Sequence, residues 1–263
     1  MHIQYYDIGL NLFTRSFPDP EKIIADAEAA GIRCILTGSE ARDNEQVNAF
    51  TKTHDLYGTA GIHPHCTDTA KEEDIARIRE IIQSNPRIVA VGETGLDYDH
   101  MYAKKENQLR FFRTLIDLAE ELKKPMFLHE RDAAEDFIRC FEGHDELCRR
   151  SVVHCYTGDR ATLEKLLDMG FYIGITGWIC DERRGDDLRD AVKILPLDRV
   201  MVETDAPYLT PRGFRLPRIN VPQNIVYVAE TLARYMGVSQ EKLEKAAREN
   251  TEKLFRISGQ EEK

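Results

Sequence analysis

The sequence has 263 residues, 42% of them hydrophobic, so it is long enough to bury a sizeable core. Its formal net charge of −10 argues against a protein that coats nucleic acid through a basic surface, but it does not exclude an enzyme that holds a few phosphates locally. There is no apolar run of about 18 residues and no basic-then-apolar start, so we expect neither a membrane span nor a secretory signal.

Six cysteines are scattered along the chain without a C-x-x-C pair. Reduced thiols are usual in cytosolic proteins, where disulfides are rare. We therefore expect a cytoplasmic protein with unpaired cysteines.

Short apolar runs alternate with amphipathic stretches eight times along the chain. The apolar runs predict strands at 3–9, 33–39, 57–63, 88–94, 125–130, 151–156, 171–177 and 200–205. The amphipathic stretches predict helices that include 20–30, 71–84, 106–123, 160–169, 186–195, 224–236 and 239–253. Gly31 and Gly170 read as helix stops, and Ser239 as the cap of the last helix.

Strands that alternate with helices pair in parallel, because parallel neighbours need a crossover between them. Eight such units in about 250 residues match an α/β protein of the (β/α)8 class, the TIM-type barrel. An open, doubly wound sheet is the alternative fold. No linker or low-complexity stretch divides the chain, so we expect residues 1–263 to form a single domain.

Histidines and carboxylates gather where the predicted strands end, the edge that carries the active site of such a barrel. These residues are His63, His65, Glu93, Asp97, His129, His154, Glu203 and Asp205. A single histidine at a strand end is more often a satisfied polar residue than a ligand. Here several strand ends converge, and imidazole with carboxylate holds divalent cations of the Zn, Mn or Mg type. Asp97 reads as a loop-shaping residue. Glu203 reads as a partner of a site residue or as half of an ion pair inside the barrel.

Six motifs in chain order give the sequence a specific resemblance: GIHPH (61–65), GETGLD (92–97), HERD (129–132), HCYTG (154–158), YIGITGWICDERRG (172–185) and ETDAPYL (203–209). Together they resemble the TatD family of metal-dependent deoxyribonucleases, which are amidohydrolase-like (β/α)8 barrels. The resemblance covers nearly the whole chain. It implies that Glu93, His129, His154 and Asp205 hold the metal and that Asp205 activates water, since a bound cation lowers the pKa of water and polarises a phosphoryl oxygen.

The first predicted strand departs from the common pattern of this family. Many members carry His-x-His there, whereas this chain has Gly9 and Asn11. The departure disfavours a permanent two-metal centre and is similar to a subgroup described as 3′-5′ exonucleases on single-stranded DNA or RNA with magnesium. Asn11 can offer an amide donor to a phosphate or a water. His63 could steady the scissile phosphate, or it could make a structural hydrogen bond.

Arginines near the predicted barrel mouth are candidates for holding phosphates, because their forked donors suit phosphate oxygens. We expect Arg131 and Arg218 to bind substrate in this way. For Arg183 and Arg184 we expect pairing with neighbouring carboxylates instead. Trp178 could stack on a terminal base, and core packing is an equal alternative.

We therefore expect a phosphodiesterase that acts on single-stranded nucleic acid ends, with Mg²⁺ as the first choice of cation and Mn²⁺ or Zn²⁺ as alternatives. Neither a membrane nor an obligate protein partner is indicated. A metal-dependent hydrolase of a small molecule on the same barrel is the second hypothesis. A non-catalytic scaffold with a decayed site is the third, and the intact set of Glu93, His129, His154 and Asp205 argues against it.

Overall fold

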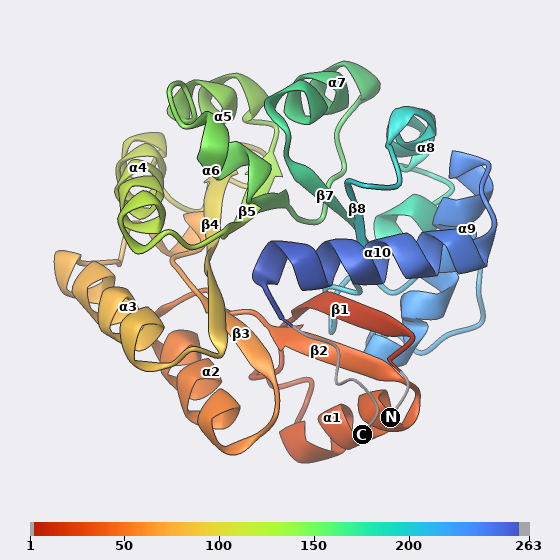
Figure 1. Cartoon of the computed structure of the whole chain (residues 1–263), viewed down its shortest axis with the longest axis horizontal. Helices are drawn as coiled ribbons and strands as arrows, with labels where there is room; N and C mark the ends of the chain where they lie inside the picture. Colours follow the sequence, from red (N-terminus) through yellow and green to blue (C-terminus); the bar gives the residue numbers. More distant parts are fainter. Residues whose placement is uncertain (1–2, 258–263) are drawn as a thin grey trace. The chain divides into compact units, whose positions relative to one another are not determined.

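A computed structural model describes residues 3–257, and its eight strands are hydrogen-bonded in chain order in one sheet (Figure 1). The strands are β1 (Tyr5–Leu10), β2 (Ile32–Leu36), β3 (Tyr57–Ala60), β4 (Ile88–Asp97), β5 (Met126–Arg131), β6 (Val152–Val153), β7 (Tyr172–Ile175) and β8 (Val200–Val202). Pairing is parallel between β3 and β4, β4 and β5, β5 and β6, and β7 and β8. With helices between the strands, this is the topology of a (β/α)8 barrel, and the predicted fold class is confirmed.

The helices between the strands and after β8 agree with most of the predicted ranges. They are α1 (Pro20–Ala29), α2 (Ala41–Thr53), α3 (Glu72–Ser84), α4 (Lys105–Leu122), α5 (Ala134–Cys140), α6 (Asp145–Arg149), α7 (Arg160–Met169), α8 (Asp186–Ala191), α9 (Ile225–Met236) and α10 (Gln240–Phe255). Short 3-10 turns are η1 (Pro64–Cys66), η2 (Gly177–Cys180), η3 (Val192–Ile194) and η4 (Pro222–Asn224). Gly31 and Gly170 have positive φ after α1 and α7, and the Ser239 hydroxyl accepts from the Lys242 amide at 3.3 Å, as predicted for these ends.

β4 is longer than predicted, β5 keeps its predicted length, and the other six strands are shorter, β6 most of all. β6 contains only Val152 and Val153 of the expected 151–156, because Cys155 turns the chain with φ of +46°. His154 still donates its backbone N–H to Leu128 at 2.9 Å, so it keeps a defined register beside β5. β4 continues to Asp97, three residues beyond the expected end, and all of its residues are buried.

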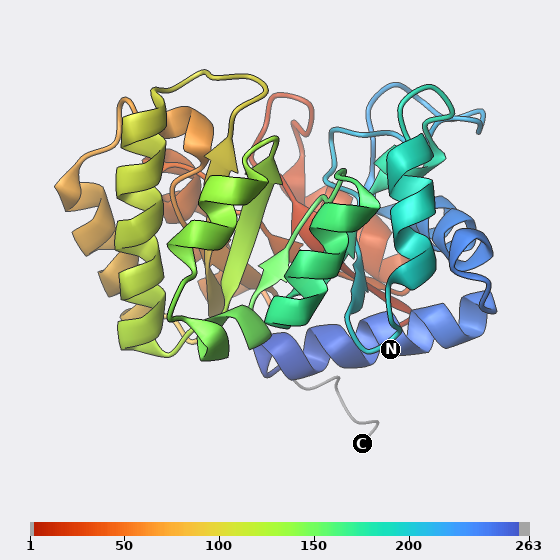
Figure 2. The ribbon, with the colours of Figure 1, turned by 90° about the horizontal axis from the view of Figure 1, so that it is seen from above.

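The chain forms two compact units. The middle unit contains Leu36–His154 and Met169–Phe171, and the terminal unit contains Met1–Ile35, Cys155–Asp168 and Tyr172–Lys263. In the middle unit, α3 and α4 pack side by side against β4 (Figures 1 and 2). In the terminal unit, α10 packs against β1, β8 and α9. The single domain expected from the sequence stays a prediction.

All six residues of β1 are buried, including Asp7. Among residues 3–257, no helix combines the length and the apolar character needed to cross a bilayer.

Candidate metal centre

Three neighbouring strands of the middle unit each bring one candidate ligand to a common point. Glu93 lies in β4, His129 lies in β5, and His154 directly follows β6. His129 Nδ1 lies 3.1 Å and His154 Nε2 lies 2.8 Å from the same oxygen, Glu93 Oε1. Glu93 and His154 are buried, so this carboxylate has little contact with water. The parallel order of these strands therefore brings together three residues that are 61 positions apart at most.

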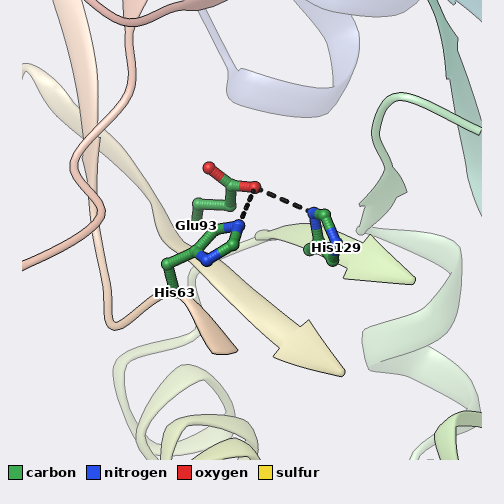
Figure 3. Close-up of side chains that lie close together, drawn as sticks. All are labelled: His63, Glu93 and His129. Atoms are coloured by element: carbon green, nitrogen blue, oxygen red, sulfur yellow. Dashed lines mark hydrogen bonds and ion pairs between the residues drawn. The ribbon is translucent and has the colours of Figure 1, made fainter. Parts of the chain in front are cut away.

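His63 adds a third imidazole to this oxygen. Its Nε2 lies 3.2 Å from Glu93 Oε1, and Figure 3 shows His63 and His129 approaching the carboxylate from different elements. The His65 backbone N–H donates to His63 Nδ1 at 3.1 Å. A neutral imidazole whose Nδ1 accepts a hydrogen bond carries its proton on Nε2. His63 therefore presents an N–H donor to the centre.

Burial and neighbouring charge set the protonation states. Burial lowers the pKa of His63, against the opposing effect of Glu93. Burial alone would raise the pKa of Glu93, but the adjacent His63 and His154, with the hydrogen bonds from His129 and His154, hold it well below its usual range. The centre thus combines an ionised carboxylate with an imidazole that favours its neutral form.

This donor set fits a divalent cation. A carboxylate and two imidazoles in a buried cluster are ligands of the Zn and Mn type, and carboxylate also suits Mg²⁺. His129 turns its Nδ1 to Glu93, while its Nε2 lies 3.4 Å from Asp97 Oδ2. A carboxylate behind the ring is the usual support of a metal-binding histidine.

Glycines let β4 and β5 approach closely enough to form the centre. A Cβ on Gly95 would lie 1.8 Å from the His129 carbonyl oxygen, and one on Gly92 would lie 2.2 Å from the Phe127 carbonyl oxygen. Both glycines have positive φ, of +148° and +145° respectively. Only glycine combines this backbone conformation with so close an approach. Glu93 lies between these two glycines, and Gly95 is the residue that pairs with His129 across the two strands.

Asp205 and Asn11 lie together in the terminal unit. Asn11 Nδ2 donates to Asp205 Oδ1 at 2.8 Å, and Leu10 forms a parallel bridge with Ala206. Asp7, at the polar face of β1, accepts from the Thr204 backbone N–H at 2.8 Å and from the Thr204 hydroxyl. β1 therefore holds the segment after β8 that carries Asp205.

Two further side chains fix this segment. Glu203 is buried and accepts the Cys155 backbone N–H at 2.6 Å, so it ties this segment to the turn that follows His154. Asn220, whose role the sequence did not indicate, donates to the carbonyl oxygens of Thr204 and Tyr208 at 3.0 and 2.7 Å. From the sequence alone Asn220 is one asparagine in a loop, and its burial becomes visible only in the structure.

Several arginines that the sequence singled out form ion pairs with carboxylates, and Arg218 lies at a cavity. Arg183 and Arg184 both bind Asp181, which confirms their predicted pairing, and Arg212 Nε lies 3.2 Å from the same carboxylate. Arg131 Nε lies 3.3 Å from Asp99 Oδ2. Arg218 is exposed and lines a cavity of about 550 Å³. The residues that line this cavity also include Trp178, Arg184, Arg212 and Phe214.

Comparison with known proteins gives a consistent result. Residues 6–256 match the family model described as TatD related DNase. A protein of Erwinia amylovora named 3′-5′ ssDNA/RNA exonuclease TatD is 39% identical over 257 residues, covering 95% of this chain and 99% of that protein. A protein of Escherichia fergusonii with the same name is 37% identical over 262 residues, covering 96% and 99% of the two chains.

Solved structures agree with these matches. The crystal structure of a TatD homologue from Escherichia coli K12 superposes with a TM-score of 0.89 at 26% identity, covering 98% of this chain and all of the other. A phosphotriesterase homology protein from Escherichia coli, with phosphate in its active site, has a TM-score of 0.66 at 15% identity over 95% and 98% of the two chains. At that identity the likeness concerns the fold alone.

Proposed function

Because this chain belongs to the family of TatD related DNases, we propose that it is a divalent-metal-dependent hydrolase that removes nucleotides from the 3′ ends of single-stranded DNA or RNA. The observation that carries this proposal is the convergence of His63, His129 and His154 on a single buried oxygen of Glu93. Such a cluster is costly to bury without a function, and its chemistry is that of a metal centre.

We assign Glu93, His129 and His154 as ligands of the cation, with Asp205 as a further carboxylate. When bound, a cation at this centre polarises a phosphoryl oxygen and acidifies water. Mg²⁺ is our first choice for its identity, and Mn²⁺ and Zn²⁺ also suit the two imidazoles.

Asp205 is the proposed base that orients and deprotonates the attacking water. The hydrogen bond from Asn11 Nδ2 to Asp205 Oδ1, at 2.8 Å, helps to orient the carboxylate for this role. The same hydrogen bond uses one of the two N–H groups of the Asn11 amide, so the other is available for the substrate contact that we assign to Asn11.

His63 is the proposed donor to the scissile phosphate. Its Nδ1 is occupied by the His65 amide, so the Nε2–H that faces Glu93 is the group able to donate to a phosphate oxygen. This assignment makes His63 a substrate contact and not a metal ligand, because a ligating nitrogen must be deprotonated.

Arg218 and Arg131 are the proposed contacts for other phosphates of the strand. Arg218 is exposed at a cavity that also contains Trp178, whose ring is a platform for a base. Arg131 would exchange its contact with Asp99 for a phosphate. We further propose a cytoplasmic location, in keeping with the six free cysteines, and no obligate protein partner.

Oligonucleotide cleavage tests this function. Purified protein is incubated with 5′-labelled single strands of DNA or RNA and with Mg²⁺, Mn²⁺, Zn²⁺ or EDTA. We expect a ladder that shortens from the 3′ end with a divalent cation and no products with EDTA. A circular strand, which has no end, is the matched control and should stay intact. Absence of cleavage with every cation would overturn the proposal in favour of a small-molecule hydrolase or a scaffold.

A further inference from the structure

A second cluster of metal-binding side chains lies in the middle unit beside the Glu93 centre. It consists of His65 in η1, Asp97 at the end of β4, and His100 in the following turn. One ligand atom from each of the three lies within 4.8 Å of the others. We call these three residues the Asp97 cluster.

Asp97 is held in a fixed orientation that presents one oxygen to the histidines. Its Oδ1 accepts the backbone N–H groups of Asp99 and His100 at 3.0 and 2.9 Å, as expected of a loop-shaping residue. Its Oδ2 lies 2.6 Å from His65 Nε2 and 2.9 Å from His100 Nδ1. Loop shaping thus occupies only half of this carboxylate.

The Asp97 cluster joins a buried carboxylate to histidines that solvent can reach. The Asp97 side chain is 1% exposed, whereas His65 and His100 are 28% and 47% exposed. Tyr102 stacks on the His100 ring at 5.5 Å and meets the His65 ring edge-on at 4.8 Å, which restricts the motion of both rings. A cation can therefore enter from the solvent side and meet a carboxylate that is already oriented.

Two imidazoles and one carboxylate are a ligand set for a borderline transition-metal cation, with one or more positions open to water. The separations of 2.6 and 2.9 Å are hydrogen-bond distances. Tetrahedral ligands about 2.0–2.1 Å from a zinc ion lie roughly 3.3 Å apart, so His65 and His100 would each have to withdraw from Asp97 by less than about 1 Å. On these grounds, we propose that the Asp97 cluster is a second cation site of the Zn²⁺ type, separate from the proposed catalytic centre.

The two sites share a neighbour. His129 turns its Nδ1 to Glu93 and lies 3.4 Å from Asp97 Oδ2 through its Nε2. The carboxylates of Glu93 and Asp97 thus lie on either side of the His129 ring. The nearest histidine to Glu93 is His154, whereas the nearest to Asp97 is His65. This arrangement allows the sites to be separated by substitution, because His65 and His100 belong to the Asp97 cluster alone and His154 belongs to the Glu93 centre alone.

Calorimetric titration of the metal-free full-length protein with Zn²⁺ tests the second site. We expect two equivalents for the wild type, one for His65→Ala, one for His100→Ala, and one for His154→Ala. The double variant His100→Ala/His154→Ala should bind none with comparable affinity. His144→Ala, which removes a histidine paired with Glu120 elsewhere in the middle unit, is the matched control and should keep both equivalents.

Unchanged stoichiometry and affinity in both His65→Ala and His100→Ala would overturn the proposal. The proposal would also be overturned if the double variant His100→Ala/His154→Ala still bound one equivalent of Zn²⁺. That result would mean that both single substitutions remove the same site. Thermal unfolding of each metal-free variant confirms that it is folded. The readout requires no nucleic acid, so a failure here is distinct from a failure of the proposed nuclease activity.

Discussion

At the scale of single residues, substitution of His129 or His154 tests whether the cluster around Glu93 is a metal centre or only a set of side chains that hydrogen-bond to one another. Both contact Glu93 Oε1, at 3.1 and 2.8 Å. We expect His129→Ala and His154→Ala each to lower turnover by at least ~100-fold, because the cation loses one of its few protein ligands. Steady-state cleavage of an oligonucleotide measures the loss.

Far-UV circular dichroism should stay near that of the wild type in both variants. His154 also packs against the Phe127 ring at 4.3 Å, so its replacement is expected to lower the unfolding temperature more than that of His129. His144→Ala is the control and should keep wild-type turnover. Full activity of either His129→Ala or His154→Ala would show that the cation is held by other groups.

Arg218 offers a different test, because its side chain is exposed beside a cavity while its backbone carbonyl accepts from the Thr210 hydroxyl at 2.9 Å. A phosphate contact made equally in the ground and transition states is uniform binding, so Arg218→Ala should raise KM several-fold and change kcat little. The increase should shrink as salt screens the contact. Arg139→Ala, on the exposed face of α5, is the matched control. Identical kinetics of Arg218→Ala and wild type over the salt range would assign Arg218 to the solvated surface.

At the scale of elements, the approach of β4 to β5 depends on Gly95. A Cβ there would lie 1.8 Å from the His129 carbonyl oxygen, a backbone atom that cannot move without displacing β5. We expect Gly95→Ala to destabilise the protein by at least ~2 kcal/mol and to weaken cation binding, because His129 moves with its strand. Thermal unfolding and calorimetric titration measure the two effects.

Gly143→Ala is the control that separates the two effects of Gly95→Ala, the steric clash between the strands and the backbone strain. Gly143 also has positive φ, of +85°, but nothing lies within 4 Å of its added Cβ. Backbone strain alone should lower the free energy of unfolding of this variant by about 1 kcal/mol, and the variant should bind the cation as the wild type does. Equal effects of the two substitutions would mean that β4 and β5 do not require the glycine for their contact.

β1 contributes a pH dependence of stability through Asp7. Burial raises the pKa of Asp7 to about 7, with a smaller contribution from Glu203, although hydrogen bonds from Thr204 oppose the shift. An unfolded aspartate titrates near 3.9. Between these values the native state holds one proton more than the unfolded state, so the free energy of unfolding falls as the pH rises from about 4 to about 7.

Asp7→Asn resembles the protonated acid and does not titrate. We compare the unfolding temperature of the wild type with that of Asp7→Asn at pH 5 and at pH 8. The wild type should lose stability relative to the variant at pH 8, by about 2–4 °C for each kcal/mol by which ionisation of Asp7 destabilises the fold. Scanning calorimetry at the two pH values measures this difference. A difference that is constant with pH would show that Asp7 titrates alike in the folded and unfolded chains.

At the scale of the whole molecule, the sequence predicted the fold and the convergence of Glu93, His129 and His154 better than it predicted the contacts that support them. Periodicity and residue type placed Glu93, His129 and His154 at strand ends, and parallel order then forces them together. The hydrogen bond from Asn11 to Asp205 joins residues that are 194 positions apart, and no local pattern encodes such a contact. The role of His100 was equally hidden, because it depends on a turn that brings its ring back to Asp97.

The final prediction concerns cooperativity, since the chain forms two compact units whereas its sequence indicates one domain. Domain boundaries normally fall in exposed linkers. Here the chain passes between the units at residues 35 and 36, within β2, where both Ile35 and Leu36 are fully buried. It passes again at residues 154 and 155, directly after β6, at 168 and 169, within α7, and at 171 and 172, at the start of β7.

A crossing inside a strand or a helix cannot act as a hinge without breaking that element, so we propose that the two units unfold together. Scanning calorimetry should give one transition whose calorimetric and van't Hoff enthalpies agree, and fluorescence of Trp178, in the terminal unit, should report the same midpoint. Gly95→Ala, in the middle unit, should lower that midpoint for both readouts equally. A Trp178 transition that stays at the wild-type temperature in this variant would show that the units are separate domains.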